Sequence, residues 1–91
     1  MLREVLLMEY CLLTFQSLTA VQRALGMLQK SGISGTIQRT PRWMEEQGCG
    51  NALRVSCKDL LLAAEVLKKN RMAHRKAYHI GENGKVAELE L

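Results

Sequence analysis

Two amphipathic helical segments, separated by short strand-like runs, constrain the fold of this chain more than any other feature. Apolar side chains recur every three or four positions in both segments, at Val21, Ala24, Leu25 and Leu28 and then at Leu60, Ala63, Ala64 and Leu67. This spacing places them on one face of a helix. The strand-like runs cover residues 10–15, 33–39, 52–56, 76–80 and 85–91.

The order of these segments predicts an α+β fold. Strand, helix, strand, strand, helix, strand is the split βαβ order of a ferredoxin-like βαββαβ sandwich, in which two helices cover one face of an antiparallel sheet. A further strand follows the pair Asn83-Gly84, which is typical of a type I′ hairpin turn. We expect one domain over residues 1–91, with a C-terminal hairpin over residues 75–91 and one sheet face open to solvent or a partner.

Residues at the helix ends predict where each helix begins and stops. Thr19 and Gln22 could form a capping box at the first helix, and Ser17 is the alternative cap. Gly32 suits the left-handed conformation that often follows a last helical turn. Ser56 is expected to cap the second helix, and its loss would then cost about 1 kcal/mol.

Length and charge narrow the class of protein. A chain of 91 residues, 47% of them apolar, has room for one hydrophobic core. The net charge of +4 is too small to indicate a nucleic-acid-binding protein. The apolar N-terminus is interrupted by Glu4, Glu9 and Tyr10, so we expect neither a membrane span nor a secretion signal.

Three cysteines, at positions 11, 49 and 57, cannot all pair within one chain. Their spacing is not that of a disulfide scaffold, so we expect a reducing, cytoplasmic location. The cysteines and the two histidines also lack the short spacings that organise most zinc sites. We therefore expect neither a metal nor another cofactor.

Cys49 is the first candidate for chemistry, because it lies between two glycines. Gly48 and Gly50 would allow access to the thiol and would let backbone amides face an anion, while Arg42 and Arg54 could add positive charge. In the alternative interpretation the glycines shape a tight turn and the cysteine is incidental. Trp43 could form an apolar wall beside the thiol or cap the end of the core.

Cys57 is a possible second thiol. It falls in the first turn of the second predicted helix, where the helix dipole lowers the pKa of a thiol, although it could equally be a small apolar side chain. Cys11 lies among leucines and is expected to be inert core. A redox switch between Cys49 and Cys57 would need their Cα atoms within about 7 Å of each other.

The basic run "KKNRMAHRK", residues 68–76, admits two interpretations. Positive charge complements the C-terminal end of a helix, and this explanation is sufficient for a solvated helix end. The alternative is a docking surface for an acidic partner.

Three stretches resemble a known family. They are "YCLLTFQSLTAVQRALGMLQKSGISGTIQRTPR", "CGNALRV" and "CKDLLLAAEVLKKN", within residues 8–70. Through the Thr-Pro-Arg at 40–42 and the Cys-Gly-x-Ala-Leu-Arg at 49–54, the chain resembles the selenium/sulfur (Se/S) carrier protein-like family. Members tend to have proline where this chain has Cys57, so a second thiol there would be peculiar to this sequence.

The resemblance implies a carrier rather than a stand-alone enzyme. Cys49 would hold a persulfide or selenylsulfide, Arg54 and Arg42 would stabilise its anionic forms, and binding would involve Gly48, Gly50, Thr40 and Trp43. The partners would be a protein donor and a protein acceptor of sulfur or selenium, and the sheet could mediate a homodimer. The alternative is a non-catalytic interaction or small-ligand-binding module that uses the open sheet face.

Overall fold

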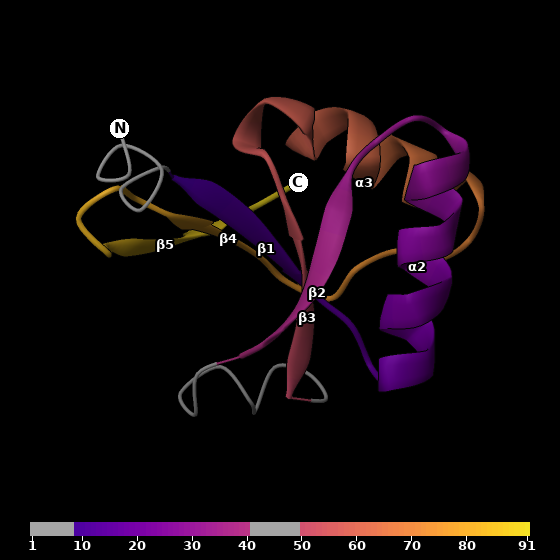
Figure 1. The fold of residues 1–91 in the computed structure, drawn as a ribbon, viewed down its shortest axis with the longest axis horizontal. Coiled ribbons are helices and arrows are strands. Elements are labelled where there is room, and N and C mark those ends of the chain that lie inside the picture. Colours follow the sequence, from indigo (N-terminus) through magenta and orange to yellow (C-terminus); the bar gives the residue numbers. More distant parts are fainter. Residues whose placement is uncertain (1–8, 41–49) are drawn as a thin grey trace.

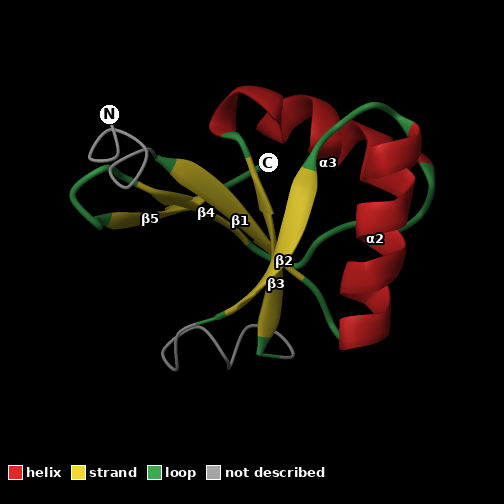
Figure 2. Cartoon of the chain, viewed as in Figure 1, coloured by secondary structure: helices red, strands yellow, loops and turns green. Residues whose placement is uncertain are grey.

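The computed structural model describes residues 9–40 and 50–91. Their elements follow the predicted order (Figures 1 and 2). They are β1 (Tyr10–Thr14), α2 (Leu18–Lys30), β2 (Gly35–Arg39), β3 (Asn51–Val55), the 3₁₀ turn η2 (Cys57–Asp59), α3 (Leu60–Lys69), β4 (Ala77–Ile80) and β5 (Val86–Leu89). Every predicted helix and strand is therefore present.

The described strands form one antiparallel sheet in the order β2-β3-β1-β4-β5. Each helix joins two strands that are not neighbours: α2 joins β1 to β2 with β3 between them, and α3 joins β3 to β4 with β1 between them. The predicted C-terminal hairpin adds β5 beside β4. The predicted α+β fold, with an antiparallel sheet and two helices, is thus confirmed, whereas the five-stranded order β2-β3-β1-β4-β5 is not that of a plain ferredoxin-like sandwich.

Both helices pack on the same face of the sheet (Figure 1). The core between them contains side chains from both helices and from β1, β3 and β4, among them Leu13, Val21, Leu28, Leu53, Leu60, Leu67 and Ala77. These are the apolar positions of the two helical stripes and the inward positions of the strands. A smaller cluster of Leu12, Ala52 and Tyr78 is buried on the opposite face.

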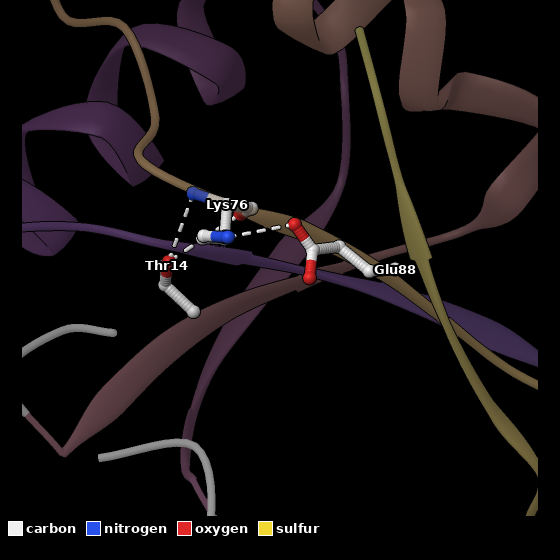
Figure 3. Close-up of polar contacts among 3 residues, drawn as sticks. All are labelled: Thr14, Lys76 and Glu88. Atoms are coloured by element: carbon white, nitrogen blue, oxygen red, sulfur yellow. Dashed lines mark hydrogen bonds and ion pairs between the residues drawn. The ribbon is translucent and has the colours of Figure 1, made fainter. Parts of the chain in front are cut away.

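Polar contacts join the middle of the sheet to its β5 edge (Figure 3). The buried Thr14 hydroxyl accepts a hydrogen bond from the Lys76 amide at 3.0 Å. The Lys76 Nζ atom then pairs with Glu88 Oε2 at 2.7 Å. The connection before β4 is therefore held by β1 on one side and by β5 on the other.

The ends of α2 show which capping residues operate. The Ser17 hydroxyl accepts a hydrogen bond from the Ala20 amide at 3.1 Å, so Ser17 is the N-cap and Thr19 is not. At the other end Gly32 has φ +80°, and the Ile33 amide donates to the Leu28 carbonyl at 2.9 Å. This is a Schellman motif with glycine in the left-handed position, as predicted.

The start of α3 differs from the prediction. Ser56 makes no side-chain capping bond, because the chain first forms the 3₁₀ turn η2 and α3 begins only at Leu60. The Ser56 carbonyl, rather than its hydroxyl, takes part by accepting from the Asp59 amide at 2.9 Å. The expected cost of losing a Ser56 cap therefore has no structural basis.

The hairpin turn also differs from the prediction. A type I′ turn requires positive φ at both central residues, but of the pair only Gly84 has positive φ, at +84°. The Gly84 amide donates to the Gly81 carbonyl at 2.9 Å, and Asn83 Oδ1 accepts from the Lys85 amide at 3.0 Å. Asn83 thus stabilises the turn through its side chain, in a loop with a single left-handed glycine.

Candidate functional site

Four of the predicted site residues, Arg42, Trp43, Gly48 and Cys49, lie outside the described residues. The residues that flank this stretch are described and meet each other. The Thr40 amide donates to the Gly50 carbonyl at 3.0 Å, which continues the β2–β3 ladder by one step. The φ of +87° at Gly50 explains why glycine follows Cys49.

Thr40, a predicted binding residue, is only 8% exposed. Among residues 9–40 and 50–91 its hydroxyl has no hydrogen-bond partner, although the side chain is buried. Buried hydroxyl groups are normally paired, so a polar atom that reached the end of β2 would gain a hydrogen bond there. The position is consistent with a binding role, which stays a prediction.

Arg54, predicted to stabilise an anion at Cys49, makes its described contacts on the sheet. Its guanidinium carbon lies 3.9 Å from the centre of the Tyr10 ring, and its Nη1 donates to Gln38 Oε1 at 3.5 Å. Arg54 is the fourth residue of β3, about 10 Å along the strand from Asn51 at a rise near 3.3 Å per residue. Its role toward Cys49 stays a prediction.

The structure joins the two other cysteines. Cys11 Sγ on β1 and Cys57 Sγ on η2 are 2.6 Å apart. Cys11 is buried in the core as predicted, but it is not isolated there, because its sulfur contacts a second sulfur. Cys57 is half-buried and packs against the same core. The thiol partner of Cys57 in the described residues is therefore Cys11, a pairing that we did not predict.

The environment of Cys11 favours its protonated form. Burial raises its pKa to about 12, and the hydrogen bond and charge of Cys57 and the charge of Glu9 act in the same direction. At neutral pH Cys11 is therefore a thiol that can donate its proton to the Cys57 sulfur. Cys57 begins the 3₁₀ turn that leads into α3.

A histidine and a carboxylate lie beside the two sulfurs. His79 is opposite Cys11 in the β1–β4 register, and its Nε2 atom is 2.8 Å from Glu9 Oε1. One ligand atom each from Glu9, Cys57 and His79 lie within 4.8 Å of one another. Thiolate, imidazole and carboxylate are ligand types of zinc, but Glu9 is exposed, and exposed acidic groups commonly lie near such side chains without a metal. Sequence spacing did not indicate this group because its members are the residue before β1, a residue of η2 and a residue of β4.

The basic run contributes to a cavity at the opposite end of α3. Arg71 and Arg75, together with Arg23 on α2, line a hollow of about 350 Å³ next to Phe15. The lining residues that the structure describes include no carboxylate. The run therefore does more than cap the helix, since it places positive charge around an opening.

The sheet face opposite the helices is only partly open. Ser34 and Thr36 are exposed and Gln38 is half-buried, whereas Leu12 and Tyr78 are buried.

None of the helices in residues 9–40 and 50–91 is long and apolar enough to cross a bilayer.

Comparison with known proteins supports the resemblance. Residues 10–79 match the model of a family described as "Putative Se/S carrier protein-like". The match extends beyond the stretch recognised from motifs and includes β4 up to His79. No curated protein and no solved structure matches the chain. Because the match covers most of the chain, from β1 to β4, the protein belongs to this Se/S carrier protein-like family.

Proposed function

We propose that the protein carries sulfur or selenium as a persulfide or selenylsulfide on Cys49 and passes it between partner proteins. The observation that carries this proposal is the family match, which runs through Cys49 and the Cys-Gly-x-Ala-Leu-Arg stretch that follows it. Supporting it, the Thr40–Gly50 hydrogen bond holds together the two ends of the stretch that contains Cys49.

The transfer uses only thiol exchange. The Cys49 thiolate attacks the outer sulfur of a donor persulfide R–S–SH, a new S–S bond forms to Cys49, and the donor leaves as the thiolate R–S⁻. The same exchange with an acceptor thiolate reverses the loading. A protein that gains and loses one sulfur in this way is a carrier without turnover of its own, and exchange rates depend on access to the sulfur attacked.

Positive charge and backbone amides would stabilise the anionic persulfide. Gly48 and Gly50 would provide amides, and Arg42 and Arg54 would provide charge. The cation–π contact of Arg54 with Tyr10 is at an exposed side chain and is worth only about 0.5–1 kcal/mol, so it would not prevent the guanidinium from moving toward an anion.

Mass spectrometry tests the assignment to Cys49. The reduced protein is incubated with glutathione persulfide and digested with trypsin, which separates Cys49 on peptide 43–54 from the other two cysteines. We expect one added sulfur on this peptide in the wild type and in Cys57→Ser, and none in Cys49→Ser. No added sulfur in the wild type, or an unchanged added mass in Cys49→Ser, would refute the proposal.

The alternative function is an interaction module that uses the sheet. β2 is at one edge of the described sheet, and its neighbourhood exposes Ser34 and Thr36. An edge strand can pair with a second copy of the chain, which would give a homodimer through the sheet. Light scattering of the wild type and of Arg39→Pro distinguishes the cases. The Thr40 amide bonds to β3, so by the alternation of an antiparallel ladder the Arg39 amide faces away from β3. Proline at position 39 would therefore remove a dimer formed through this edge and keep the β2–β3 bonds of a monomer.

A further inference from the structure

We propose that Cys11 and Cys57 form a redox-active dithiol that reduces a sulfur–sulfur bond of a partner molecule. Cys57 is the attacking thiol, and Cys11 is the resolving thiol that closes an internal disulfide. This function goes beyond sulfur carriage and does not depend on Cys49.

The contact between the sulfurs is the first observation. Cys11 and Cys57 are 46 positions apart in the sequence, and their Sγ atoms are 2.6 Å apart. The contact is built by the sheet, because β1 and β3 pair with Cys11 opposite Val55, and Cys57 follows Val55 by two residues. Two thiols held by neighbouring elements of a packed core need little chain movement to form a bond.

The difference in exposure assigns the two roles. Cys11 is 1% exposed, so an external disulfide cannot reach its sulfur. Cys57 is only half-buried, so of the two cysteines it is the one that reaches the surface. An incoming sulfur therefore meets Cys57 first, and Cys11 lies behind it, where a resolving thiol is needed.

Two polar side chains lie near the attacking sulfur. Cys57 Sγ lies within 4.8 Å of ligand atoms of both His79 and Glu9. The 2.8 Å contact between His79 Nε2 and Glu9 Oε1 orients the imidazole. The attacking sulfur is therefore next to an imidazole and a carboxylate that hold each other in place.

The reaction balances in two steps. The Cys57 thiolate attacks R–S–S–R′, a mixed disulfide Cys57–S–S–R forms, and R′–S⁻ leaves and takes up the proton that Cys57 lost. Cys11 then loses its proton and attacks the Cys57 sulfur, the Cys11–Cys57 bond forms, and R–S⁻ leaves and is protonated. The partner gains two electrons and two protons, and the protein loses the same number.

Glutathione disulfide is a suitable probe, and the Cys49→Ser background keeps the third thiol out of the measurement. The chelator-treated, reduced protein is incubated with glutathione disulfide. We expect Cys49→Ser to lose the mass of two hydrogens and to yield a cross-link between tryptic peptides 4–23 and 55–58, which contain Cys11 and Cys57. In Cys49→Ser/Cys11→Ser the resolving thiol is absent, so one glutathione should stay on Cys57.

Two further variants keep the proposal testable if serine in the core prevents folding. Cys11→Ala removes the thiol without burying a hydroxyl and should trap glutathione on Cys57 in the same way. In the Cys49→Ser background, which is used for both variants, Cys57→Ser leaves only the buried thiol and should react at least tenfold more slowly. The proposal is overturned if glutathione accumulates on Cys57 equally with and without Cys11, or if Cys11 reacts as fast as Cys57.

Discussion

Replacing Arg71 with glycine should stabilise the protein, because Arg71 is held in a conformation that favours glycine. Its φ is +58°, and within residues 9–40 and 50–91 it is the one residue other than glycine with positive φ. The Met72 amide donates to the Leu67 carbonyl at 2.8 Å, so the end of α3 repeats the Schellman motif that ends α2. The corresponding position after α2 is Gly32.

The magnitude follows from two opposing terms. A side chain with a Cβ atom in the left-handed region costs about 1–2 kcal/mol. Glycine recovers this energy but loses about 0.5–1 kcal/mol more backbone entropy on folding. The net gain for Arg71→Gly should therefore be about 0.5–1 kcal/mol, which corresponds to a rise in Tm of about 2–8 °C for a domain of this size.

Urea unfolding of three variants separates the backbone from the side chain. Arg71→Ala removes the same charge from the arginine-lined cavity while keeping a Cβ atom, so it controls for the lost side chain. Gly32→Ala is the reverse change, and because a Cβ atom there meets nothing within 4 Å, its cost of about 1 kcal/mol should be purely conformational. Arg71→Gly being no more stable than Arg71→Ala would refute the reasoning.

Three other predictions concern pH and helix capping. Because the pKa of Cys11 rises from 9.0 unfolded to about 12 folded, stability should be complete below pH 9 and fall by at most about 1.4 kcal/mol per pH unit up to pH 12. Urea midpoints should show this fall in the wild type and a weaker one in Cys11→Val, and equal slopes would contradict it. Burial, aided by the charge of Lys68, lowers the pKa of His74 below 6.5, so the contribution of His74 to stability is present above pH 6.5 and is lost on acidification. Thermal melts of His74→Gln should therefore depend less on pH between 6.5 and 5 than those of the wild type. An unchanged pH dependence would count against this role. Ser17→Ala should lower the free energy of unfolding in urea by about 1 kcal/mol and Ser56→Ala should leave it almost unchanged, because of these two serines only Ser17 forms a side-chain capping bond. Similar losses in both variants would show that the helix ends are wrongly assigned.

Sequence periodicity determined the elements and their inward faces. The spacing of Val21, Ala24 and Leu28 reports which side of α2 must leave water, and these residues are buried. The apolar periodicity arises because one face of each element must be buried, and this holds however the elements pack against one another. It does not report local competition for hydrogen bonds, which is why the cap at Ser56 and the turn type at Asn83 were wrong: their nearby amides found other acceptors.

Of the two candidate sites, one was predictable from the sequence and the other was not. The motif around Cys49 is contiguous, so the sequence alone identified the family and the carrier hypothesis. The dithiol of Cys11 and Cys57, with His79 and Glu9 beside it, comes from three separate elements and has no short spacing to reveal it. Only the tertiary structure decided it, because the antiparallel register of β1 with β3 and β4 determines which distant side chains share one face of the sheet.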